Sequence, residues 1–174
     1  MSTTDEQVIR VDAGGWGLTW AVDGAGVLHQ VGLGAEGHLA ALDVDPVWYP
    51  LAFPTFGGGD TYLPAPLRVP HHDGTLTTRL VVADTRRVTV DGGEHVVVTL
   101  RDELFDLHVE LHLRNHPASA VLEQWVEVHH DEARPVRLFD YDSVAPFLLV
   151  QDNAELVHFG GSGWADEWRW TTQE

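Results

Sequence analysis

Residues 107–114 read Leu-His-Val-Glu-Leu-His-Leu-Arg, an unbroken alternation of apolar and polar side chains. Successive side chains of a β-strand point to opposite faces, so this stretch is typical of a strand with one buried and one solvated side. Upstream, residues 86–90 and 96–100 flank Asp91-Gly92-Gly93, whose turn chemistry predicts a β-hairpin. A two-residue period therefore governs this part of the chain.

The same period extends over the rest of the sequence. Short apolar or alternating runs between turn residues predict further strands at Val8–Val11, Gly17–Val22, Val27–Val31, Leu76–Val82, Val121–Val128, Val136–Tyr141 and Leu156–Phe159. About ten short strands without a helical period indicate an all-β fold. We expect residues 1–174 to form a single domain, an antiparallel β-sandwich with little helix.

The composition limits the classes of partner. Ten Lys and Arg residues against 27 Asp and Glu residues give a formal net charge of −17. Such a charge repels phosphate backbones and anionic lipid, so neither nucleic acid nor a membrane surface is an expected partner. The absence of cysteine excludes disulfides and thiolate chemistry. The first residues lack the basic start and apolar run of a signal peptide, so we expect a cytoplasmic location.

A proline-rich stretch, residues 43–70, interrupts the strand pattern. Proline cannot donate to a sheet ladder, so we expect an ordered irregular loop, and loops of this length are often functional. Near the centre of this loop, Gly57-Gly58-Gly59 leads directly into Asp60. Consecutive glycines lose much conformational entropy on folding, which suggests an unusual backbone path or a close approach by another group.

The eleven histidines raise the question of a metal site. Three of them, His108, His112 and His116, are spaced by four residues, but on a strand this spacing spreads them over ~13 Å. One ion cannot bridge that distance. We therefore predict a solvated strand face, with no bound metal and no cofactor.

Other polar and aromatic clusters allow more than one interpretation. His71-His72, His129-His130 and the acidic residue Glu132 adjoin turns, where such residues are usually solvated or cap the turn. No spacing singles out the two carboxyl groups that glycoside hydrolysis requires. Aromatic residues gather before the glycines and near the end of the chain: Trp48, Tyr49, Phe53, Phe56, Trp164, Trp168 and Trp170. They either pack in the core or stack on a sugar.

The glycine stretch carries a resemblance to a known family. Tyr49-Pro50, followed by residues 53–60 (Phe-Pro-Thr-Phe-Gly-Gly-Gly-Asp) and Pro64-Ala65, resembles a motif in the N-terminal domain of glycoside hydrolase family 36, the bacterial α-galactosidases. The opening strands around Trp20 and residues 26–34 are similar to the start of that domain. Residues 156–167 are similar to its closing strand and Gly-x-Trp passage. The resemblance thus covers most of the chain.

Membership of this family would imply a β-supersandwich followed by a (β/α)₈ barrel that carries two catalytic aspartates of a retaining mechanism. The sequence ends before any such barrel, so we expect a non-catalytic N-terminal domain of a longer α-galactosidase-type hydrolase, inactive alone. Expected partners are an α-galactoside sugar, the downstream barrel domain and a second copy in a homo-oligomer.

The resemblance also implies roles for individual residues. Asp60 matches the family aspartate that accepts a hydrogen bond from a galactose hydroxyl, and Gly57, Gly58 and Gly59 match glycines that let the backbone pass close to the barrel. Trp164 matches an aromatic residue at the domain edge, without a catalytic role. Thr61-Tyr62 and Asp166 depart from the family pattern, which has Phe-Arg and Arg at these places.

The departures put the sugar preference in doubt, and two other functions stay open. A free-standing carbohydrate-binding module would need its own aromatic platform. A mutarotase-like sugar enzyme would need a His/Glu acid–base pair, and no motif in the sequence places one.

Overall fold

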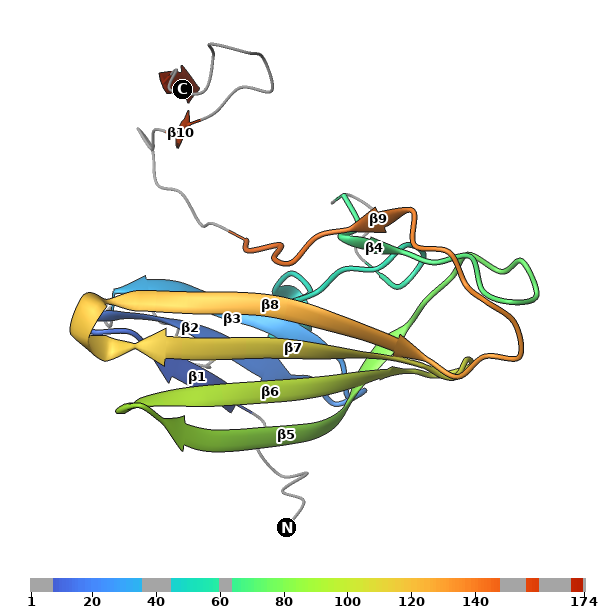
Figure 1. The fold of residues 1–174 in the computed structure, drawn as a ribbon, viewed down its shortest axis with the longest axis horizontal. Helices are drawn as coiled ribbons and strands as arrows, with labels where there is room; N and C mark the ends of the chain where they lie inside the picture. The colour runs from blue at the N-terminus through green and yellow to red at the C-terminus, as the bar shows by residue number, and fades with distance from the viewer. Residues whose placement is uncertain (1–7, 36–44, 60–63, 148–155, 160–169, 174) are drawn as a thin grey trace.

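The structure is a computed structural model that describes residues 8–35, 45–59, 64–147, 156–159 and 170–173. Its main body consists of two antiparallel sheets (Figure 1). The first sheet has three strands in the order β1 (Val8–Asp12), β2 (Trp16–Val22) and β3 (Leu28–Ala35). The second has four strands in the order β5 (Leu80–Val90), β6 (Gly93–Asp102), β7 (Leu107–His116) and β8 (Val121–His130).

Smaller elements complete the described structure. β4 (Leu67–Arg68) pairs with β9 (Asp140–Tyr141), and β10 (Leu156–Phe159) pairs with β11 (Trp170–Gln173). Two single-turn 3₁₀ segments, η2 (Pro46–Trp48) and η3 (Pro117–Ser119), lie in the connections. The prediction of an all-β antiparallel sandwich is confirmed. No helix within the described ranges is long and apolar enough to cross a membrane.

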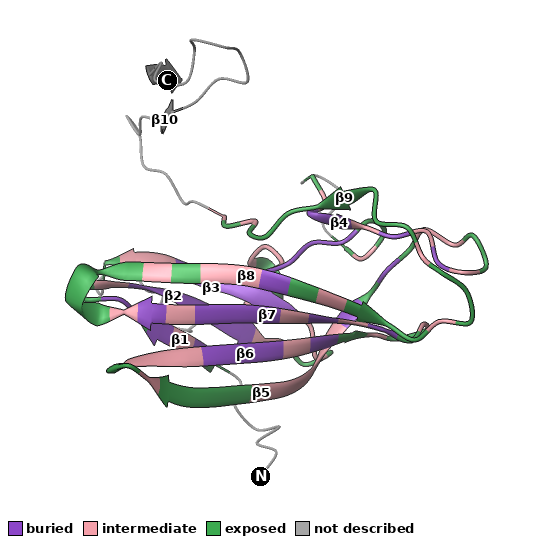
Figure 2. Cartoon of the chain, in the orientation of Figure 1, coloured by how far each residue is buried: buried purple, intermediate pink, exposed green. Residues whose placement is uncertain are grey.

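The two sheets enclose one hydrophobic core. Figure 1 shows the three-stranded sheet behind the four-stranded one, and Figure 2 shows buried residues concentrated in β2, β6 and β7. The core draws on both sheets: Ile9, Val11, Leu18 and Trp20 from the first, and Val96, Val98, Leu100, Leu107, Val109, Leu111 and Leu113 from the second. Burial of these side chains is the main source of stability for such a sandwich.

Strand β7 follows the alternation that its sequence predicts. All four of its apolar residues are buried in the core, and β6 and β8 pair with it on either side. The alternation places His108, Glu110, His112 and Arg114 on the outer face, but His112 is only 6% exposed, so the prediction that it is solvated is wrong. The rings of Trp125 and His95, from the two neighbouring strands, stack against it at 4.6 and 5.3 Å between centroids. Burial lowers the pKa of His112, although Glu127 and Glu110 oppose this effect.

The hairpin between β5 and β6 forms at the predicted turn. Asp91 and Gly92 both have positive φ, 49° and 77°, as a two-residue type I′ turn requires. β5 is one strand of 11 residues where the sequence suggested two shorter ones, because a bulge between Val82 and Asp84 lets pairing with β6 continue. Residues 76–79, predicted as strand, lie outside it, and among them Thr78 donates a backbone hydrogen bond to the Phe56 carbonyl.

Other boundaries also differ from the prediction. β3 continues to Ala35, because β2 pairs with it along its whole length. Only the last two residues of the predicted strand Val136–Tyr141 pair, since their partner β4 is itself two residues long. β4 and β11 were not predicted, whereas β10 has the predicted bounds.

Candidate functional site

Only some of the predicted site residues are among the residues that the structure describes. Gly57, Gly58 and Gly59 are described, whereas Asp60 and Trp164 lie outside the described residues, as do Thr61, Tyr62 and Asp166. The geometry of the site is therefore that of the backbone leading into residue 60 and of the groups that support it.

Each of the three glycines lies against other groups of this domain. Gly57 has φ of +76°, and a Cβ atom there would lie 2.8 Å from Thr77 Oγ1. A Cβ atom at Gly58 would collide with Thr55 Oγ1 and lie 2.5 Å from the carbonyl oxygen of Thr78. At Gly59 the nearest atom, Leu51 Cδ1, would be 3.1 Å away. Packing within the domain thus gives a physical reason for glycine at these positions, most strongly at Gly58.

Hydrogen bonds hold this stretch between β4 and residues 75–78. Phe56 N donates to the Leu67 carbonyl at 3.2 Å, and Thr78 N donates to the Phe56 carbonyl at 3.1 Å. Thr55 Oγ1 donates to the Thr78 carbonyl at 2.5 Å. Thr78 is completely buried, so its contacts are shielded from water. The backbone at Phe56, which leads into the glycines, is therefore held on both sides.

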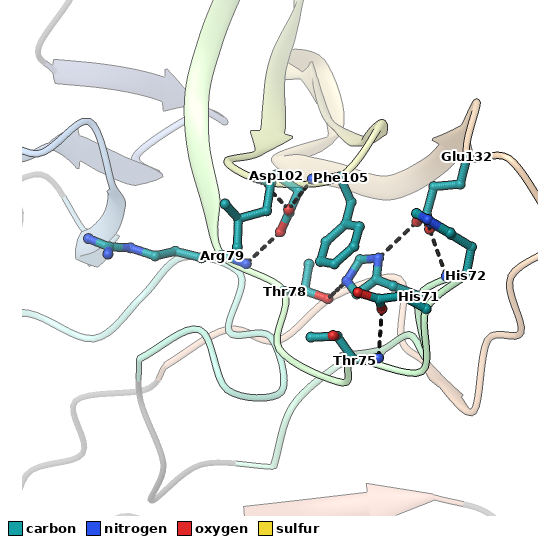
Figure 3. Close-up of polar contacts among 10 residues, drawn as sticks. His71, His72, Thr75, Thr78, Arg79, Asp102, Phe105 and Glu132 are labelled. Carbon is teal, nitrogen blue, oxygen red and sulfur yellow. Dashed lines mark hydrogen bonds and ion pairs between the residues drawn. The ribbon is translucent and has the colours of Figure 1, made fainter.

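Thr78 is held in turn by a buried histidine and glutamate (Figure 3). Glu132 Oε1 accepts a hydrogen bond from His71 Nδ1 at 2.8 Å, and His71 Nε2 lies 2.9 Å from Thr78 Oγ1. The ring of Phe105 stacks on His71 at 3.8 Å between centroids. The side chains of His71 and Glu132 are fully buried, so the prediction that His71 lies at the surface is wrong.

Glu132 carries its charge in this buried place because three donors surround it. Its Oε2 accepts from the His72 backbone N–H at 2.9 Å and from His72 Nδ1 at 2.8 Å, in addition to the His71 contact. Burial raises the pKa of a carboxyl group, but these hydrogen bonds outweigh that effect and hold the pKa of Glu132 below its usual value of 4.5. The residues are 60 positions apart in the sequence, and no local pattern links them.

An open hollow lies beside the glycine stretch. It is lined by residues on both sides of residues 60–63 and by β9: Phe56, Pro64, Ala65, Arg68, Phe139, Asp140, Tyr141 and Asp142. The Arg68 guanidinium lies 4.8 Å from the centre of the Phe56 ring and 5.9 Å from that of Phe139. Phe56, Phe139 and Tyr141 are all exposed. Exposed rings next to carboxylates suit contact with a sugar or with a second protein domain.

Comparison with known proteins identifies the fold and the family. The family profile described as the glycosyl hydrolase family 36 N-terminal domain matches residues 32–174. Among curated proteins, no significant match to the chain is found.

Solved structures of α-galactosidases share the fold. The α-galactosidase from Lactobacillus brevis aligns with 99% of this chain at 15% identity and a TM-score of 0.79. A variant of the α-galactosidase AgaA from Geobacillus stearothermophilus, in complex with raffinose, aligns with 95% at 17% identity and a TM-score of 0.74. AgaB from the same organism aligns with 82% at 16% identity and a TM-score of 0.64.

The chain spans only part of these proteins, 28% of the first two and 24% of AgaB. At such identities the structural likeness establishes the fold, while the profile match covers more than half of the chain and establishes the family. The chain belongs to glycosyl hydrolase family 36 and matches the N-terminal domain of that family.

Proposed function

We propose that this chain is the non-catalytic N-terminal domain of an α-galactosidase-type retaining hydrolase and that it completes the sugar pocket of a separate catalytic barrel. In this proposal Asp60 accepts a hydrogen bond from a hydroxyl of the galactosyl group. One observation carries the proposal beyond family membership: Phe56, directly before the three glycines, is hydrogen-bonded on one side to Leu67 and on the other to Thr78. A sugar contact needs a fixed platform, because small displacements weaken oriented hydrogen bonds.

The open hollow beside the glycine stretch is the proposed contact surface for the barrel. Its lining includes Phe56 and Pro64, which precede and follow residues 60–63 in the sequence. Exposed Phe139 and Tyr141 would be buried by a docked domain, as aromatic residues are at interfaces. The homologous AgaA variant was solved with raffinose, an observation that concerns that protein and supports a galactoside as the substrate class here.

A free-standing carbohydrate-binding module is the second candidate. The exposed aromatic rings of the hollow favour it, because they could stack on a sugar without help from another domain. A mutarotase-like enzyme is less well supported. The His/Glu pair formed by His71 and Glu132 is fully buried, so neither group can touch a sugar in this conformation.

Two assays on the purified 174-residue chain separate these functions. A non-catalytic domain should neither hydrolyse a nitrophenyl α-galactoside nor bind galactose or melibiose appreciably, because the catalytic carboxyl pair and most of the pocket belong to the barrel. Saturable binding of galactose by calorimetry would instead support the module. Turnover of the nitrophenyl substrate by homogeneous chain would contradict both.

A further inference from the structure

Two glutamates face each other on the outer side of the four-stranded sheet. Glu110 of β7 pairs directly with Glu127 of β8 in the antiparallel register. Like charges in directly opposed positions of a sheet destabilise it. Among the described residues, one arginine approaches the pair: Arg86 lies 3.6 Å from Glu110 Oε1. A cation between the two carboxylates would remove the repulsion.

Two histidines complete the surroundings of these carboxylates. His129 of β8 contributes a ring nitrogen that lies, with one oxygen each of Glu110 and Glu127, in a group whose ligand atoms are all within 4.8 Å of one another. His112 of β7 is on the other side, with its Nε2 atom 3.5 Å from Glu110 Oε2 and 3.5 Å from Glu127 Oε1. His129 Nε2 is 3.6 Å from Glu127 Oε2. Both oxygens of Glu127 therefore face an imidazole.

The ring of His112 is oriented by a second histidine. Its Nδ1 atom lies 3.1 Å from His95 Nε2, within hydrogen-bond distance. When Nδ1–H donates to His95, the Nε2 atom carries a lone pair that points at the two carboxylates. Nε2 is buried and has no hydrogen-bond partner. Metal-binding histidines are typically oriented in this way, with the far ring nitrogen hydrogen-bonded to another group.

The contacts between these imidazoles and carboxylates are loose. Separations of 3.5–3.6 Å are longer than the 2.7–3.2 Å of a good N–H···O hydrogen bond. In a tetrahedral zinc site with bonds of about 2.0–2.2 Å, neighbouring ligand atoms lie about 3.3–3.6 Å apart. Each imidazole nitrogen thus lies at such a separation from a carboxylate oxygen, and one ligand atom each of Glu110, Glu127 and His129 lies within 4.8 Å of the other two.

We propose that Glu110, Glu127 and His129 bind one divalent transition-metal ion of the zinc class, beside the unpartnered Nε2 atom of His112. A site of imidazole and carboxylate ligands suits Zn²⁺, whereas Mg²⁺ and Ca²⁺ prefer oxygen ligands alone. The bound ion would link β7 to β8. The sequence predicted no metal because it placed histidines along one strand, but these ligands come from two paired strands.

Calorimetric titration of the untagged, chelator-treated chain with Zn²⁺ tests this proposal. We expect saturation at one ion per chain and a higher melting temperature with Zn²⁺ but not with Mg²⁺, because a ligand that binds the folded state stabilises it. Glu127→Gln and His129→Asn should each weaken Zn²⁺ affinity by at least about ten-fold. Both side chains are nearly half exposed, so both variants should fold, which circular dichroism would verify.

A second histidine–glutamate pair on the same sheet provides the matched control. His116 and Glu123 are an exposed pair at 3.2 Å, formed by the same two strands. Glu123→Gln and His116→Asn should leave Zn²⁺ affinity and stoichiometry unchanged. The proposal would be overturned if the parent chain took up no stoichiometric Zn²⁺. Uptake that the Glu127 and His129 variants retain, or that the controls reduce equally, would overturn it as well.

Discussion

Replacing Gly58 by alanine tests whether packing within this domain, rather than clearance for another domain, requires the glycine. The added methyl group would lie 2.5 Å from the Thr78 carbonyl oxygen and would collide with Thr55 Oγ1. Ordinary contact begins at 3.4 Å, so the added methyl group and the Thr78 carbonyl must separate by about 0.9 Å more, and the Thr55 hydroxyl must move farther still. That movement also breaks the hydrogen bond from Thr55 to Thr78.

The expected loss of stability is the sum of the steric cost and the lost hydrogen bond. Forcing a methyl group into a packed site costs about 1–3 kcal/mol, and the buried hydrogen bond contributes about 1 kcal/mol more. We therefore expect Gly58→Ala to lower the free energy of unfolding by about 2–4 kcal/mol. In a domain of this size the melting temperature should fall by about 5–15 °C. Urea and thermal unfolding of the purified chain measure both quantities.

Gly24→Ala is the control for the intrinsic effect of the substitution. No atom lies within 4 Å of a Cβ at that turn position, and Gly24 does not have positive φ. Its unfolding free energy should stay within about 0.5 kcal/mol of the parent value. If Gly58→Ala were as stable as Gly24→Ala, packing on Thr78 would not explain the glycine. A requirement imposed from outside this domain would then be the better account.

Two further predictions concern the support and the charge of the site. Glu132→Gln should lower the free energy of unfolding by about 1–3 kcal/mol, because an amide leaves one buried N–H of His71 or His72 without an acceptor. The control Glu123→Gln, at an exposed residue, should change the free energy of unfolding by less than about 0.5 kcal/mol. The pKa of Glu132 is lowered in the folded state, so its contribution to folding stability is present above its unfolded pKa of about 4.5 and is lost as the pH falls through the lower folded value. Urea midpoints measured from pH 6 to 3 should therefore decline less for Glu132→Gln than for the parent chain. Parallel curves for the two proteins would refute the assignment. The second prediction concerns a protein that joins this chain to the catalytic barrel of a family member. There, Asp60→Asn should reduce kcat/KM on α-galactosides about 10- to 100-fold without lowering the melting temperature, because a charge-assisted hydrogen bond is lost. A stable variant with unchanged kcat/KM would show that Asp60 is not part of the site.

Local sequence pattern predicts the parts of the fold that depend on local chemistry. The alternation in residues 107–114 predicts β7 and its buried face, and Asp91-Gly92 predicts the hairpin turn, because side-chain period and turn conformation are properties of adjacent residues. The length of β5 cannot be predicted from local pattern in this way. Its bulge at residues 82–84 depends on the partner strand β6, which its own sequence does not describe.

Only one feature of the candidate site could be predicted from the sequence. The sequence identifies Gly57–Gly59 as a place where backbone geometry matters, but residues 77–78, which approach Gly57 and Gly58, are about 20 positions away. His71 was expected at the surface because turn neighbours are usually solvated. A 60-residue separation hides the pairing with Glu132 that instead buries it. The same limit concealed the opposed glutamates of β7 and β8, since the strand register determines which residues face each other.

The buried glutamate and the glycine stretch belong to one structural unit. Glu132 fixes His71, His71 contacts the Thr78 hydroxyl, and the Thr78 carbonyl accepts from Thr55 directly where Gly58 packs. Burying a carboxylate is unfavourable unless donors compensate it, and here three donors do so. Such a network stabilises little compared with apolar packing, but it restricts the positions of its members. A domain that only had to fold could dispense with it, whereas one that must hold the backbone before residue 60 at a fixed position could not.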